Sequence, residues 1–199
     1  DGVPGTSAAI QIFFSNLAGS NCGSLLPTGN FTDILDGLEC TLIDNGMPCV
    51  ILKASDFGIT GKESRDQLEL NTEIKSAIES IRLKAGSLME LGNVTKKSVP
   101  KMTLISEPLN GGALNTRSFI PHRAHASIGV FAAITVAAAC AIPDTVAASL
   151  AQVPYNGIYE IEHPSGCTKV RLELDENGVI ERTGIIRTAR KLMDGTVYA

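Results

Sequence analysis

The sequence predicts an α+β domain, and three features of its hydrophobic pattern support that fold class. Several short segments alternate apolar and polar residues, as half-buried β-strands do. The stretch from Gln67 to Leu91 repeats apolar residues at three- and four-residue steps, which indicates an amphipathic helix. Another stretch, Ala126–Pro143, carries no charge and is rich in alanine, which predicts a helix buried on every side.

Eight segments show the strand pattern. They are Ala8–Ser15, Leu38–Ile43, Cys49–Lys53, Met102–Ser106, Leu114–Phe119, Gly157–Glu162, Thr168–Leu174 and Val179–Thr188. The alternation is most regular in Thr168–Leu174, and Asp175–Gly178 follows it as a predicted hairpin turn. In that turn we expect Asn177 and Gly178 to supply the positive φ angles.

Two helices are expected. The amphipathic one has a charged face that we expect to be solvated, and its apolar face consists of Leu70, Ile74, Ile78, Ile81, Ala85 and Leu88. The central one is expected over His125–Ile142, because Pro143 cannot continue a helix. Its small side chains permit close packing, so strands can surround it. No repeat or low-complexity linker divides the chain, which indicates one domain.

Composition excludes several functional classes. The formal charge is 17 − 21 = −4 and no long basic run exists, so a nucleic-acid partner is not expected. The charge-free stretch is too weakly apolar to favour a membrane span over burial in the domain. Five cysteines without zinc spacing indicate free thiols, a cytoplasmic location and no metal site. The chain starts without Met or a signal peptide, so we expect a piece of a longer protein.

The segment that precedes the central helix is the strongest candidate for a site. It contains His122, Arg123 and His125, two of the three histidines and an arginine, followed by Ser127 as a candidate helix cap. Cations at a helix N-terminus oppose the helix dipole unless an anion joins them. Unpaired backbone N–H groups at the same place favour an anion. The alternative is an ordinary buried helix whose entry happens to be basic.

Weaker candidates lie elsewhere in the chain. The polar turn Thr28-Gly29-Asn30 can offer donors to a carboxylate, Lys101 stands at a strand end, and Ser165-Gly166 joins two strands. Each has a structural alternative, as a plain turn or a surface lysine. The triplet around Cys22 resembles a reactive thiol, but no His or Lys lies near it in sequence, so we expect an unreactive cysteine.

Eight motifs occur in an order that resembles the PrpF family of methylaconitate isomerases, and most closely its 4-oxalomesaconate tautomerase branch. They are Asp1–Thr6, Leu25–Asn30, Ile43–Pro48, Gly58–Glu63, Val99–Lys101, Phe119–Ser127, His163–Gly166 and Arg187–Lys191. Each motif is weak alone, and the eight together span the chain.

The resemblance implies a diaminopimelate-epimerase-like fold of two similar halves. In each half a curved, mostly antiparallel sheet or barrel wraps a central helix, and the active site lies between the halves. Residues 1–186 would form the C-terminal domain, and residues 187–199 a tail that returns to an N-terminal domain outside this chain. The acid/base Lys and Cys proposed for the family belong to that other half. The matching position before the central helix here is Ala124, so no catalytic residue is expected in this chain.

The activity implied by the resemblance is a cofactor-independent, allylic 1,3-proton shift in an unsaturated tricarboxylate such as 4-oxalomesaconate or methylaconitate. This chain would bind the substrate carboxylates, through Thr28, Gly29, Asn30, Lys101, His122, Arg123, His125, Ser127, Ser165 and Gly166. The expected partners are the substrate and the N-terminal half, with a homodimer left open. Two alternatives remain: a non-catalytic carboxylate-binding or assembly domain, and a cofactor-independent racemase or epimerase.

Overall fold

The computed structural model describes residues 6–198, so all but Thr6 of the first motif lies outside the described part. Ten strands form one mixed sheet in the order β1-β10-β9-β8-β6-β5-β4-β3-β2, with β7 paired to β6. Their bounds are β1 Ala9–Phe14, β2 Asp33–Leu35, β3 Leu38–Asp44, β4 Pro48–Lys53, β5 Lys101–Ser106, β6 Leu114–Ile120, β7 Arg123–Ala124, β8 Ile158–His163, β9 Gly166–Leu174 and β10 Ile180–Thr188.

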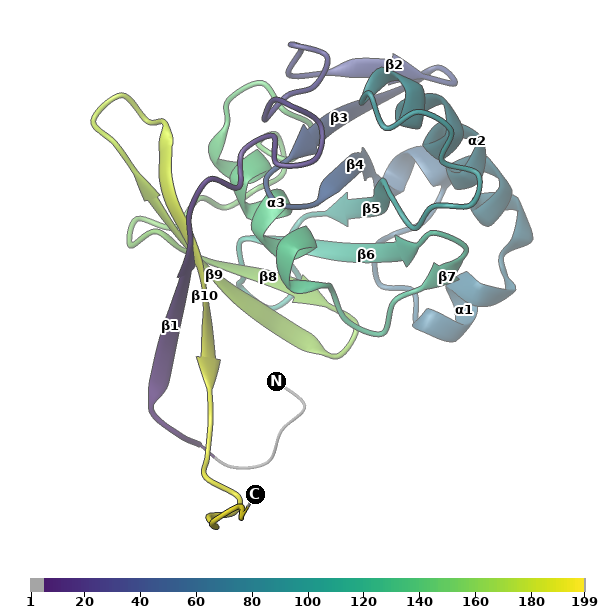
Figure 1. The fold of residues 1–199 in the computed structure, drawn as a ribbon. Helices are drawn as coiled ribbons and strands as arrows, with labels where there is room; N and C mark the ends of the chain where they lie inside the picture. The colour runs from purple at the N-terminus through teal and green to yellow at the C-terminus, as the bar shows by residue number, and fades with distance from the viewer. Residues whose placement is uncertain (1–5, 199) are drawn as a thin grey trace.

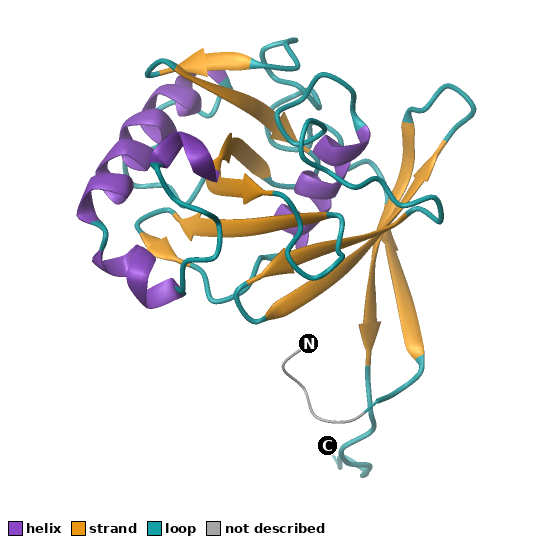
Figure 2. Ribbon diagram, turned by 180° about the vertical axis from the view of Figure 1, so that it is seen from behind, coloured by secondary structure: helices purple, strands orange, loops and turns teal. Residues whose placement is uncertain are grey.

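Helices cover both faces of the curved sheet (Figures 1 and 2). The helix α3, Val130–Ala141, lies inside the curve, whereas α1, Arg65–Leu70, and α2, Thr72–Leu88, lie outside it. Strand β4 shows how one strand serves both layers. Its alternate residues pack toward α3 (Cys49, Ile51) or toward α2 (Val50, Leu52), as the period of a strand requires.

Most neighbouring strands are antiparallel, and the two parallel pairs each enclose a helical connection. Strand β4 is parallel to β5, and the chain between them forms the 3-10 helix η1, Ala54–Phe57, and then α1 and α2. Strand β6 is parallel to β8, and α3 lies between them in the chain. Parallel neighbours need such long crossovers. The expected α+β fold with a curved, mostly antiparallel sheet around a central helix is therefore confirmed.

All eight predicted strands are present, with bounds shifted by one or two residues. The strands β2 and β7 were not predicted, because both are too short to show alternation. The predicted helix from Gln67 to Leu91 is wrong as a single helix. It breaks at Asn71, whose side chain caps α2 by accepting from the Ile74 N–H, and Leu70 before the break is exposed.

The central helix begins later than expected. We predicted His125 as its start, but Arg123 and Ala124 pair with β6 as β7, and Gly129 is the extended residue before the first turn. The helix ends at Ala141, close to the predicted end, and all of Ala132–Cys140 is buried. Among the described residues, no helix is long and apolar enough to cross a membrane.

The β9–β10 hairpin exists, but its turn differs from the prediction. Only Gly178 has a positive φ, of 79°, whereas Asn177 does not. The Asp175 carboxylate instead accepts from the backbone N–H groups of Asn177 and Val179, at 2.9 and 2.8 Å. An Asp side chain thus stabilises the first part of the turn and leaves only the glycine in the left-handed region.

Strands β1 and β10 form an arm that extends away from the rest of the sheet (Figure 1). Ile10 and Ile12 on this arm are 45% and 44% exposed, although isoleucine is among the residues most often buried. The following residues, 189–198, are exposed and have no regular secondary structure. The arm is therefore an apolar surface that the described residues do not cover.

Candidate functional site

A small pocket of about 120 Å³ opens at the N-terminus of α3. Lys101 and His125 line it together with Gly129 and the first residues of the helix. Gly129 has no side chain to cap the helix, so the first N–H groups of α3 have no side-chain acceptor there. These groups and the helix dipole make the pocket favourable for an anion.

Lys101 starts strand β5 and is half-buried. Burial lowers the pKa of its ammonium group, while the nearby Cys49 thiol raises it and the Arg82 guanidinium lowers it further. No ion pair is formed by Lys101 within the described part of the chain, so its charge is available to a ligand.

His125 lines the same pocket, and hydrogen bonds to two serines fix both its backbone and its ring. Its N–H donates to the Ser118 carbonyl at 2.8 Å, and its Nδ1 accepts from the Ser127 N–H at 2.9 Å. This assignment places the ring proton on Nε2. Burial lowers the pKa of His125, and the charges of Lys101 and Arg65 lower it further. At neutral pH the ring is therefore a neutral donor, and it becomes a cation only below its usual range.

Ser127 lies in the loop before α3 but does not cap the helix, which corrects the prediction. Its N–H donates to His125 and its hydroxyl donates to the Ile128 carbonyl at 3.4 Å. Because the helix begins at Val130, Ser127 is two residues too early to cap it.

His122 and Arg123 do not line the pocket. The chain reverses after Ile120, so β7 pairs back onto β6 and turns these side chains toward the outer helices. The His122 Nδ1 lies 3.7 Å from the Glu79 carboxylate. Burial, the largest single effect, raises the pKa of Glu69, but Lys75, the Ala124 N–H and the charge of Arg123 together lower it. His122 therefore contacts the outer helix α2, and Arg123 acts on Glu69 of α1 through its charge.

The turn Thr28-Gly29-Asn30 also lies elsewhere. The Thr28 hydroxyl and the Asn30 amide both donate to the Asp33 carboxylate, at 2.7 and 2.9 Å. Two residues further on, Thr32 donates to the Asp144 carbonyl, which follows the C-terminal end of α3. That end is about 18 Å from the helix N-terminus. The donors of this turn are used internally, as the structural alternative expected.

Ser165 and Gly166 lie closer to the site, Ser165 in the turn between β8 and β9 and Gly166 as the first residue of β9. Ser165 lines a second, open pocket with Ala126, which belongs to the loop between His125 and α3. The Ser165 hydroxyl lies 3.2 Å from the His163 Nδ1. Burial lowers the pKa of His163, with a smaller contribution from His125, so the two histidines lie within electrostatic range.

Arg65 and Arg117 also line this second pocket, although neither is predicted from the sequence as a site residue. The Arg65 Nε donates to the Ala124 carbonyl at 3.0 Å and thus fixes the start of the loop. Arg117 is the only charged residue of β6 and is 6% exposed. A lone arginine inside a neutral strand is the signal that could have identified it.

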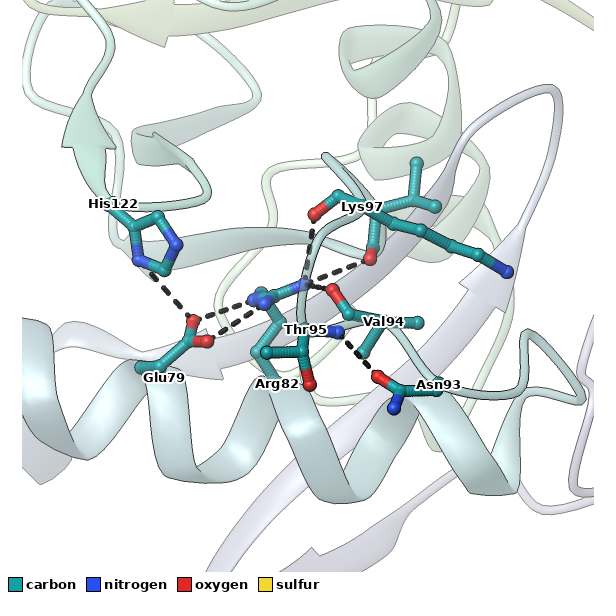
Figure 3. A network of polar contacts seen from close by, with 8 residues as sticks. Glu79, Arg82, Asn93, Val94, Thr95, Lys97 and His122 are labelled. Carbon is teal, nitrogen blue, oxygen red and sulfur yellow. Dashed lines mark hydrogen bonds and ion pairs between the residues drawn. The ribbon is translucent and has the colours of Figure 1, made fainter.

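A buried network behind the site supports the segment that leads to Lys101 (Figure 3). The Arg82 side chain on α2 is fully buried and binds both carboxylate oxygens of Glu79, at 2.7 and 2.8 Å. Its Nη1 donates to the backbone carbonyls of Val94, Lys97 and Val99, at 3.0, 3.3 and 3.0 Å, respectively. The segment ends two residues before Lys101, so this guanidinium fixes the approach to the pocket.

Cys22 is buried and its thiol lies beside Asp44, whose carboxylate accepts from the Cys22 N–H at 2.9 Å. Burial, assisted by the Asp44 charge, raises the pKa of Cys22 to about 12, which agrees with the prediction of an unreactive thiol. Within residues 6–198 no disulfide links any of the five cysteines. In residues 6–198 no three metal-ligating side chains gather at one place.

This chain is similar to several known isomerases. The (4E)-oxalomesaconate Delta-isomerase of Novosphingobium sp. (strain KA1) is 56% identical over all of this chain and 56% of its own length. The 4-oxalomesaconate tautomerase of Pseudomonas putida (strain KT2440) is 52% identical over 99% of this chain and 55% of its own length. The crystal structure of methylitaconate-delta-isomerase has a TM-score of 0.89 and 27% identity, covering 99% of this chain and 57% of that one.

This chain therefore spans little more than half the length of these relatives. The model of the PrpF protein family matches residues 1–199, from one end of the chain to the other. With that match and two relatives above 50% identity, the chain belongs to the PrpF family.

Proposed function

We propose that this chain is the carboxylate-binding half of a PrpF-type isomerase that tautomerises an unsaturated tricarboxylate such as 4-oxalomesaconate or methylaconitate. The single observation that carries the proposal is the pocket at the N-terminus of α3, which is lined by Lys101 and the His125 ring and faces the positive end of the helix dipole. The names of the relatives supply the reaction class: each is an isomerase or tautomerase of an unsaturated carboxylate.

The chemistry needs positive charge at this place. Removal of the allylic proton gives a dienolate whose negative charge spreads into a conjugated carboxylate. Fixed donors that face that carboxylate stabilise the charge as it develops, and one such donor contributes on the order of 3 kcal/mol. Lys101 and the first N–H groups of α3 are the donors here, with the neutral His125 as a further one. The proton-transfer groups would come from a second half of the protein.

The apolar arm supports the proposal that a second half of the protein packs against this chain and supplies the proton-transfer groups. Strand β1 exposes Ile10 and Ile12, which an adjoining domain would cover, and the tail from residue 187, which starts at the end of β10, would return toward that domain. A cytoplasmic enzyme without a metal or organic cofactor, active through the cleft between two halves, is part of the same proposal. A homodimer is compatible with it.

The test uses the full-length protein and the ultraviolet absorbance of the keto and enol forms of 4-oxalomesaconate. Lys101→Met should lower kcat/KM by about 100-fold, the scale of losing one electrostatic donor. Lys96→Met, the same exchange at an exposed site, should change it by less than about twofold.

Three results would contradict the proposal. Equal activity of Lys101→Met and the control would remove Lys101 from the site. Turnover by residues 1–199 alone would show that the acid/base groups lie in this chain. Binding of citrate by the full-length protein without turnover of any unsaturated tricarboxylate would favour the non-catalytic or epimerase alternatives.

A further inference from the structure

The chain buries two arginines, and only one of them has a carboxylate partner. Arg82 is bound by Glu79 through both oxygens, as an ion pair in a buried site requires. Arg117 is 6% exposed and has no carboxylate oxygen within 4.0 Å among the described residues. A buried guanidinium without an anion pays a large desolvation cost. Within residues 6–198, Arg117 is therefore a buried cation with no carboxylate in direct contact.

The hydrogen bonds of Arg117 go to neutral oxygens and leave one nitrogen free. Its Nε donates to the Glu63 carbonyl at 2.7 Å, and its Nη1 donates to the Asn115 side chain and the Thr116 carbonyl at 3.0 and 2.9 Å. Its Nη2 makes no hydrogen bond within residues 6–198. Three fixed bonds orient the guanidinium plane, and the free Nη2 is the donor left for a ligand.

The two nearest carboxylates cannot compensate Arg117, because backbone N–H groups already hold them. Glu63 accepts from the N–H groups of Thr60 and Gly61, both at 2.8 Å. Glu162 accepts from three backbone N–H groups of the loop 109–112, at 2.7 to 2.8 Å. Both carboxylates act on Arg117 only at a distance, and burial, the larger effect, lowers the pKa of Arg117.

Arg117 lines an open pocket of about 430 Å³ that also includes Lys62, Arg65 and the Ser165 hydroxyl. Glu63 and Asp66 line it as well, which leaves one net positive charge among its ionisable residues. Ala126 belongs to its wall, and the loop from His125 to Gly129 separates it from the Lys101 pocket. One loop thus has a pocket with cationic side chains on each side.

We propose that the pocket around Arg117 is a second carboxylate subsite, which holds one carboxylate of the tricarboxylate whose other end lies at Lys101. This inference rests on the proposed function, because it assigns a place to another part of the same substrate. A carboxylate that accepts from the free Nη2 would supply a counter-ion in direct contact with Arg117. The Ser165 hydroxyl, on the pocket wall, is a further donor.

The test measures ligand affinity by calorimetry in the full-length protein, with citrate as the tricarboxylate probe and glutarate as a dicarboxylate. Arg117→Lys keeps the charge but loses the Nη2 donors and the planar guanidinium that three bonds orient, so it should weaken citrate binding by about tenfold and glutarate binding much less. Arg182→Lys, the same exchange on the surface of β10, is the matched control and should leave both affinities unchanged.

Arg117 also binds the Glu63 carbonyl, so Arg117→Lys could disturb the fold as well as the pocket. A second variant therefore tests the pocket without changing Arg117. Ser165→Ala and Lys62→Met remove side chains of the pocket wall at exposed positions, and together they should weaken citrate binding by about threefold. Equal citrate affinity in the wild type, Arg117→Lys and this double variant would overturn the subsite.

The controls separate this failure from failure of the proposed function. Loss of citrate binding in Lys101→Met with full binding in Arg117→Lys would refute only the second subsite. Full binding in both variants would refute the proposed function itself. A lower melting temperature of ligand-free Arg117→Lys with unchanged citrate affinity would assign Arg117 to a carboxylate of the protein's own second half and also overturn the proposal.

Discussion

The pair of Glu79 and Arg82 gives the most direct stability prediction, because Glu79→Gln removes a charge and almost no volume. Arg82 is fully buried, and its only carboxylate among residues 6–198 would become neutral. Breaking a buried ion pair by removing one partner costs about 3–5 kcal/mol. Glu79 itself is 25% exposed and the Gln oxygen still accepts one bond, so we expect about 2–3 kcal/mol. For a chain of this length that lowers Tm by roughly 4–12 °C.

The assay is urea unfolding followed by circular dichroism, with the free energy of unfolding taken at equal slope m. Glu73→Gln is the matched control, since it makes the same exchange on the same helix at an exposed position. Its cost should stay within about 0.5 kcal/mol, including the small loss of an acidic residue in the first turn. Equal stability of the two variants would refute the view that Arg82 needs its counter-ion.

The same pair predicts a pH dependence with a definite sign. Hydrogen bonding by Arg82 lowers the pKa of Glu79, burial opposes this, and the charges of Arg82 and His122 lower the pKa further. A carboxyl whose folded pKa is depressed contributes stability above its unfolded pKa of about 4.3 and loses it as pH falls through the folded value. The difference between wild type and Glu79→Gln should therefore be full at pH 6–7 and shrink below about pH 4. A constant difference down to pH 2 would contradict it.

Two further predictions concern the site and the thiols. Because burial and neighbouring cations lower the pKa of His125, citrate affinity should rise with acidity only below about pH 6.5, and His125→Ala should abolish that rise, whereas Arg123→Lys should leave affinity within about twofold. Calorimetry from pH 5 to 8 checks this, and a midpoint above 7 would refute it. Because the pKa of Cys22 is raised to about 12, iodoacetamide at pH 8 should label it in the folded chain far more slowly than in urea, and equal rates would show a reactive thiol.

Local signals in the sequence were sufficient for the strands and for the buried nature of α3. Alternation and the absence of charge are properties of consecutive residues, so they need no tertiary information. The start of α3 could not be predicted, because Arg123 and Ala124 form β7 only through pairing with β6. Sequence adjacency suggested one cationic cluster, but strand pairing directs His122 and Arg123 to one side of the sheet and His125 to the other.

The site residues show the same limit. His125 was predicted from its place before the helix, and Lys101 from its place at a strand end, and both line the pocket. Arg65 and Arg117 come from α1 and β6, which are 52 positions apart in sequence and meet only in the fold. A single sequence does not reveal which of its distant residues are in contact.

The alanines of α3 determine how tightly the sheet can bend. A helix with methyl side chains is narrow, so strands on both sides, β4 and β9 among them, can approach its axis closely. Larger side chains at Ala133 or Ala137 would cost about 1–3 kcal/mol each and would widen the curve. Lys101 is on a strand of that curve and His125 is beside the axis. The spacing of these two pocket-lining groups is thus encoded partly in the methyl groups of Ala133 and Ala137, which do not line the pocket themselves.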